Sequence, residues 1–201
     1  MKTSIRTALA TALTAIILSS TTFTTFATDR IKNPSAENTI SGVDMVMVTG
    51  NVDVYLIQGD KEAVKVTPIE SEEVKISIKK KGNKLFIDGA GPERRTVYVY
   101  VKDLKRIHAS KASMVKTQGN FKLGMLQVFL LDAARANLSV STTSLYTVVK
   151  DHSKLKLNGS AGQHILVKDK LAIIKTDKFM ADKTQGSATV PSYAVNVVKK
   201  G

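Results

Sequence analysis

Three aspartates that end similar heptapeptides are the side chains whose type and spacing best suit metal chemistry. Each heptapeptide starts with Leu, has an apolar residue at its fourth position and ends with Asp132, Asp151 or Asp177; a related one ends with Ser110. If these segments stack at the strand spacing of about 4.8 Å, the carboxylates form a column that could hold Ca²⁺. The alternative is that each Asp favours a turn and is neutralised by nearby Lys and Arg side chains.

Basic and aromatic side chains are a second kind of candidate, a surface for anions or sugars. A run of three lysines precedes the turn signal Gly82-Asn83, and an Arg pair precedes two tyrosines that alternate with valines. If the valines face the core, the tyrosines point outward, where their rings could stack on an acidic glycan. The alternative is that the lysines are merely solvated and the tyrosines cover a loop. The candidate binding residues are Lys79, Lys80, Lys81, Arg94, Arg95, Tyr98 and Tyr100.

No residue pattern in the chain predicts a catalytic centre or a cofactor. The three histidines, His108, His152 and His164, have no helical spacing and no Cys to join them, so they do not predict a zinc site. No Gly-x-Ser-x-Gly motif places a nucleophilic serine on a strand-to-helix turn. An enzyme is therefore the less favoured class, and its best form is a Ca²⁺-dependent polysaccharide lyase or hydrolase that uses the Asp column with Arg135, by analogy of fold alone.

The elements that must position these candidates are short β-strands. Runs rich in Val, Ile and Tyr alternate between apolar and polar residues and are separated by Gly, Asn and Pro signals, with no long helical pattern. The predicted strands are Val43–Val48, Val52–Ile57, Ala63–Thr67, Val74–Ile78, Lys84–Ile87 and Thr96–Val101.

The second half of the chain carries the repeat. The final polar residues of the four heptapeptides are separated by 22, 19 and 26 residues, and Lys-Thr-Gln-Gly occurs at both 116–119 and 183–186. A β-rich period near 20 residues is typical of a β-helix, in which each turn of chain stacks on the previous one. The sequence predicts an all-β fold, a single-stranded right-handed parallel β-helix whose β-rich N-terminal half continues into the repeat turns. An antiparallel sandwich is the alternative.

The N-terminus predicts export. Lys2 and Arg6 precede an apolar stretch from Ala8 to Leu18, and Thr25-Phe26-Ala27 offers a small-residue cleavage site, which is the order of a secretory signal peptide. We expect a signal at 1–27, a flexible lead-in at 28–40 and one domain at 41–201. No later segment has the length of a transmembrane helix, and the chain contains no Cys, so no disulfide supports the core.

Charge suggests the class of partner. The formal net charge is +13, and removal of the signal's two cations leaves +11. A domain this basic attracts polyanions, and in the periplasm or outside the cell these are acidic polysaccharide, lipopolysaccharide or an envelope protein rather than nucleic acid. Dispersed lysines that only maintain solubility are the alternative.

The order of these features resembles the auto-transporter adhesin head, or GIN, domain family of exported bacterial proteins. The resemblance covers nearly all of residues 40–200. It is carried by the phrases 42–48 and 52–59, by the strand 82–87, and by Ser110-Lys111-Ala112-Ser113, which is similar to the family's Ser-Gly-Ala-Ser turn. It implies a right-handed parallel β-helix in an envelope protein and little chemistry. The loss of Gly at these corners suggests that they need no positive φ or form a different turn.

Together these observations predict a non-enzymatic binding or structural module of the cell envelope, adhesin-like or polyanion- and glycan-binding through its basic surface. Self-association is a further alternative, because both ends of a β-helix are open edges and Tyr193–Val198 reads as a last strand that could pair with a second copy.

Overall fold

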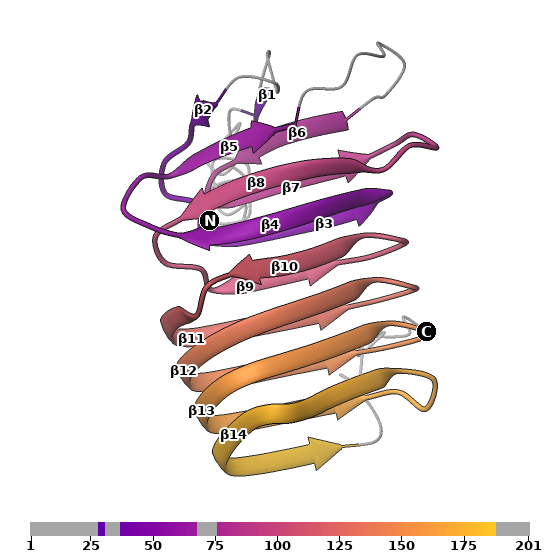
Figure 1. The fold of residues 1–201 in the computed structure, drawn as a ribbon. Coiled ribbons are helices and arrows are strands. Elements are labelled where there is room, and N and C mark those ends of the chain that lie inside the picture. The colour runs from indigo at the N-terminus through magenta and orange to yellow at the C-terminus, as the bar shows by residue number, and fades with distance from the viewer. Residues whose placement is uncertain (1–27, 31–36, 68–75, 188–201) are drawn as a thin grey trace, which may run out of the picture.

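The computed structural model describes residues 28–30, 37–67 and 76–187, and its regular elements there are fourteen strands of one continuous sheet (Figure 1). No helix long and apolar enough to cross a membrane occurs in these ranges. The strands are β1 (Thr28–Arg30), β2 (Asn38–Thr39), β3 (Met45–Gly50), β4 (Val52–Gln58), β5 (Ala63–Val66), β6 (Ile76–Lys81), β7 (Lys84–Gly89), β8 (Arg95–Val101), β9 (Arg106–Ala109), β10 (Met114–Gln118), β11 (Phe121–Leu130), β12 (Arg135–Val149), β13 (Lys154–Lys168) and β14 (Ile173–Ser187).

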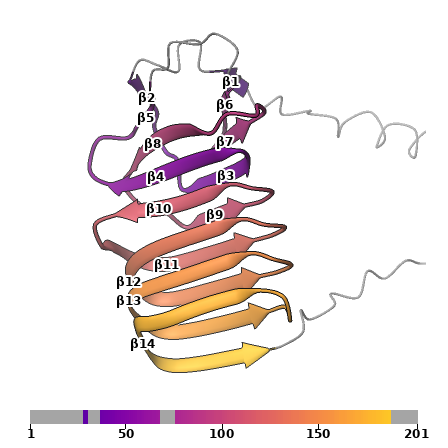
Figure 2. The ribbon, with the colours of Figure 1, turned by 45° about the vertical axis from the view of Figure 1, so that its right-hand side comes forward.

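The strands are stacked so that the chain passes between two layers (Figure 2). One layer, here called layer A, contains β1, β6, β7, β3 and β9 in that order and continues into the C-terminal halves of β11 and β12. The other, layer B, contains β2, β5, β8, β4 and β10 and continues into the N-terminal halves of β12, β13 and β14. The order of strands in the stack therefore differs from their order in the chain, because β3 and β4 lie between β7–β8 and β9–β10.

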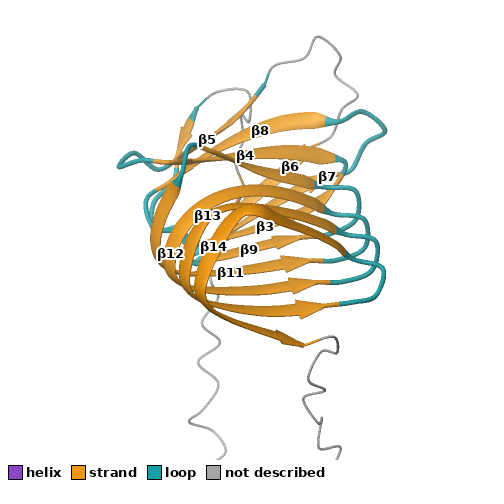
Figure 3. Cartoon of the chain, turned by 60° about the horizontal axis from the view of Figure 1, so that its bottom comes forward, coloured by secondary structure: helices purple, strands orange, loops and turns teal. Residues whose placement is uncertain are grey.

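The long strands β11 to β14 give the stack its regular part (Figure 3). They pair in parallel, with Leu126 opposite Leu145 and Leu145 opposite His164, so each strand lies 19 residues after its neighbour. We call each stretch of chain between equivalent turns a coil. The predicted stacking of Leu126 on Leu145 is confirmed, and both side chains are fully buried.

The core lies between the two layers and follows from the period-2 alternation of the strands. In β8, Val97, Val99 and Val101 are fully buried, whereas Tyr98 and Tyr100 are half-buried on the outer surface, as the sequence predicted. The same alternation in every layer-B strand produces one inward row of residues across the stack. That row comprises Val66, Val97, Val54, Val115, Ala136, Leu155 and Ile174.

The all-β prediction is confirmed, but the sheet is mixed rather than wholly parallel. At the N-terminal end of the stack, β6 pairs with both β7 and β1 in antiparallel fashion, and β5 does so with β8 and β2. The reason is local: Gly82-Asn83 joins β6 to β7 by a turn too short for a parallel connection. Parts of the expected lead-in form β1 and β2, while the signal at 1–27 and the strand Tyr193–Val198 lie outside the described residues.

The corners of the coils correct the expectation about positive φ. Lys111, Asp132 and Asp151 have φ of 57°, 61° and 54°. Each occupies the second position of a corner whose fourth residue donates its N–H to the carbonyl of the first, as Ser113 does to Ser110. This second position is the Gly position of the Ser-Gly-Ala-Ser turn, so the left-handed conformation persists although the glycine is absent.

We expect Lys111→Gly to stabilise the protein by roughly 0.5–1 kcal/mol. Glycine removes the left-handed penalty of about 1–2 kcal/mol per residue, and its greater unfolded-state entropy offsets part of that gain. The matched control is Ala112→Gly, one residue later, which has no positive φ and should lose about 0.5–1 kcal/mol. Urea unfolding would measure both variants, and a loss of stability in both would show that the corner conformation carries no strain.

Candidate functional site

The carboxylates expected to form a metal site serve the corners instead. The Asp132 carboxylate accepts the Lys111 N–H at 2.8 Å, and the Asp151 carboxylate accepts the Asp132 N–H at 3.0 Å. Each Asp therefore links its coil to the preceding one through a backbone donor. The placement of Asp177 in this column is wrong, because Asp177 lies within β14 and the last corner is formed by residues 169–172. Within the described ranges, no three His, Cys, Asp or Glu side chains are grouped to hold a metal ion.

The basic residues singled out in the sequence lie at separate places. Lys79 and Lys81 are exposed near the end of β6, and the turn predicted after them is present. Arg94 is held by an ion pair with Asp53 and donates to the Ala112 carbonyl at 2.8 Å, so its charge is already used within the protein. Arg95 is only 8% exposed. These side chains do not form one binding surface.

Tyr98 does join a larger arrangement on the outer surface of layer B. Its ring stacks on that of Tyr55 in the neighbouring strand β4, with centroids 5.4 Å apart and planes at 23°. The Lys116 ammonium lies 5.1 Å from the centroid of the Tyr55 ring and 3.3 Å from its hydroxyl. Tyr100 is two residues further along β8 and belongs to a different row, opposite Ile57.

This outer row continues across the stack into a basic groove of about 330 Å³. Strand register places Asn137 opposite Lys116, Lys156 opposite Asn137, and Lys175 opposite Lys156. A parallel outer row two residues earlier contains Arg135 and Lys154. The groove is lined by five cations, Lys116, Arg135, Lys154, Lys156 and Lys175, together with Met114, Ala136, Asn137, Leu155 and Ile173.

The electrostatics of the basic groove favour an anionic ligand. No carboxylate lines it, and none of its five cations takes part in an ion pair among the described residues. Cations on adjacent strands are about 4.8 Å apart at the backbone, so they repel one another until an anion lies between them. Arg135, Lys154, Lys156 and Lys175 are exposed, and these long side chains can reach a ligand without disturbing the core.

Sequence reasoning missed this groove because its cations are far apart in the chain. The available signal was the register of the corners. The buried fourth residues Ser113, Ala134, Ser153 and Ala172 are each followed by an outward, an inward and a second outward residue. At those outward positions three of the four coils carry a cation at one or both places.

The histidines have structural surroundings. His164 is buried, its Nε2 lies 2.9 Å from the Thr147 hydroxyl, and its ring packs edge-on against Phe179. Burial lowers the pKa of His164 from its ordinary value, which favours the neutral ring. His108 stacks on Phe129 with centroids 6.1 Å apart. These surroundings satisfy the two rings within the core and on the surface of layer A.

Comparisons with known proteins agree with the fold. A putative adhesin from Bacteroides fragilis has a TM-score of 0.63 at 14% identity, over 80% of this chain and 77% of that one. A putative adhesin and a putative lipid binding protein from Parabacteroides distasonis give 0.57 and 0.52 at 13% identity, with the same coverage. No curated protein matches in sequence. The family model described as "Putative auto-transporter adhesin, head GIN domain" matches residues 43–198, and the chain therefore belongs to this family.

Proposed function

We propose that this protein is an exported, non-enzymatic binding module of the cell envelope that holds acidic polymers in the basic groove. One observation carries the proposal: five cations converge on one outer surface without a carboxylate among them. Membership of an adhesin-like family supports binding as the general role and an exported or surface location. The signal at 1–27, the single domain at 41–201 and the right-handed parallel β-helix are parts of this proposal.

The ligand class follows from how the cations are arranged. They succeed one another from strand to strand, so a linear polymer that lies across the strands would meet a new cation about every 4.8 Å. A chain of carboxylated sugars and the phosphates of lipopolysaccharide share the chemistry that this arrangement would recognise. The Tyr55 and Tyr98 rings extend the same row and offer a surface on which a sugar ring could stack.

The test is the salt dependence of binding to polygalacturonate, to lipopolysaccharide and to uncharged dextran. A polyanion that engages five cations releases counterions, so the logarithm of the association constant should fall with the logarithm of salt concentration with a slope of about −3 to −4. Stronger binding to one polyanion identifies the source of the anion. Equal binding to dextran, or a slope near zero, would contradict the proposal.

Self-association stays a second proposal. Among the described residues, Leu171, Ile173 and Met180 are exposed apolar side chains in or just before β14, and Met180 is 77% exposed. Apolar side chains beside the last described strand favour contact with another chain. The molar mass in solution would show whether copies associate.

A further inference from the structure

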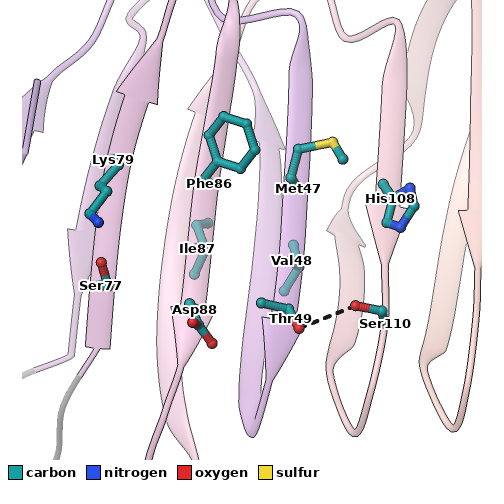
Figure 4. Close-up of a pocket in the computed structure, with 10 residues that line it drawn as sticks. All are labelled: Met47, Val48, Thr49, Ser77, Lys79, Phe86, Ile87, Asp88, His108 and Ser110. Atoms are coloured by element: carbon teal, nitrogen blue, oxygen red, sulfur yellow. Dashed lines mark hydrogen bonds between the residues drawn. The ribbon is translucent and has the colours of Figure 1, made fainter. Parts of the chain in front are cut away.

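A second groove, of about 410 Å³, lies on the outer surface of layer A and differs in character from the basic groove (Figure 4). It crosses strands β6, β7, β3 and β9, and register aligns its side chains in two outward rows. One row contains Lys79, Phe86, Met47 and His108. The other contains Ser77, Asp88, Thr49 and Ser110. We call this site the neutral groove.

The two rows have different chemistry. The first is apolar in its middle, where the Phe86 ring is 38% exposed beside Met47. The second consists of hydroxyls and one carboxylate, and the Ser110 and Thr49 hydroxyls are 3.2 Å apart in a hydrogen bond. The rows are separated by about 7 Å along the strands, and the inward-facing Ile87 and Val48 lie between them. A ligand in the groove would therefore meet an apolar edge and a hydrogen-bonding edge at once.

The charges within the neutral groove balance. Lys79 and Asp88 are its one cation and one carboxylate. Burial, and then the Arg106 guanidinium, lower the pKa of His108 despite the opposing effect of Asp132, so the ring favours its neutral form. On a chain with a formal net charge of +13, a groove without net charge is unusual. Its chemistry does not match the polyanion proposed for the basic groove.

Other classes of ligand fit less well. A peptide that adds a strand needs a free edge, but β6, β7, β3 and β9 are each paired on both sides. An acyl chain would cover Ser77, Asp88 and Thr49 without offering them hydrogen bonds, which costs free energy. A sugar ring has an apolar C–H face for Phe86 and hydroxyls for the polar row. We propose that the neutral groove binds an uncharged oligosaccharide.

The test uses saturation-transfer NMR and titration with chitohexaose, cellohexaose and maltohexaose. We expect at least one to bind with an affinity that salt does not change, because no net charge is neutralised. Phe86→Ala should weaken this binding about 10-fold through the loss of ring contact, whereas Phe86→Trp should retain it. Phe86 is partly exposed, so its truncation spares the core, and circular dichroism would verify the fold. Met180→Ala, which removes an exposed apolar side chain from β14, is the matched control.

The carboxylate supplies a second variant. Asp88→Asn keeps the size of the side chain, and we expect it to weaken sugar binding while polygalacturonate binding is unchanged, with Asp177→Asn on β14 as its control. This separates the neutral groove from the basic groove, so that one proposal can fail without the other. Failure of all three sugars to bind, equal binding by Phe86→Ala, or tight binding of oleate in place of sugar would overturn the inference.

Discussion

A protein in which Arg135, Lys154 and Lys156 are all changed to glutamine is expected to bind polygalacturonate about 100-fold more weakly than the unaltered protein. Each basic residue near an anionic surface contributes about 1 kcal/mol, so three together correspond to roughly two powers of ten. The salt slope should also become shallower by about 2, because three fewer counterions are released. All three side chains are exposed, so the fold should be retained. Titration at about 50 mM and 200 mM salt measures both effects.

The matched control removes the same number of charges from another surface. Lys79, Lys80 and Lys81 are contiguous in the chain and lie on β6, away from the basic groove. Their change to glutamine alters the net charge by the same amount and should weaken binding less than about threefold, since only long-range attraction is lost. If the two triple variants lost equal affinity, binding would depend on net charge alone and the basic groove would have no special role.

Changing Gly159 to alanine should destabilise the protein by about 3 kcal/mol or more. Gly159 lies within β13 at φ 103°, where residues with a Cβ are strained. A Cβ at this position would overlap the carbonyl oxygen of Val140 in the neighbouring strand, and that atom is backbone. The strands must separate to make room, and parallel pairing on both sides of β13 would suffer. Since total stability is commonly about 5–15 kcal/mol, this is a large share.

Gly124 in β11 provides the comparison for Gly159. A Cβ built on Gly124 meets no atom within 4 Å, and its φ is not in the left-handed region. Gly124→Ala should therefore change stability by less than about 1 kcal/mol. Urea unfolding of both variants gives the difference. A midpoint for Gly159→Ala equal to that of Gly124→Ala would mean that β13 relaxes around the new methyl group at little cost.

Local patterning accounts for the part of the fold that the sequence could predict. Alternation in residues 96–101 assigned the inward valines and outward tyrosines of β8 correctly, since a strand leaves side chains only two faces. The heptapeptide pattern placed Leu126 opposite Leu145, because both are the first inward residues after a bend of the coil. Turn chemistry located the β6–β7 hairpin at Gly82-Asn83.

The fourth repeat shows where pattern matching fails. Leu171, Ile174 and Asp177 reproduce the spacing of the earlier heptapeptides by coincidence, but register places the corner at 169–172 and leaves Leu171 exposed. A pattern of three residues cannot distinguish a corner from a strand, whereas pairing with β13 can. The same limit hid the position of β3 and β4 between later strands, since nonlocal pairing leaves little trace in a single sequence.

The candidate site was harder to predict than the fold. A run such as Lys79–Lys81 draws attention in a sequence, yet neighbours in a strand point to opposite faces and cannot act together. The residues that do converge are single lysines about 20 positions apart, which only the register of the coils brings side by side.

The 19-residue offset between β12 and β13 has an evolutionary consequence. Each of these coils pairs with the one before it and the one after it, so tandem duplication of one 19-residue unit would insert a new layer while keeping every buried side chain facing inward. A duplicated coil that contains Lys154 and Lys156 would lengthen the basic groove by one strand spacing and add two charges. The valency of such a binder is therefore inherited in whole steps, independently of the chemistry at each step.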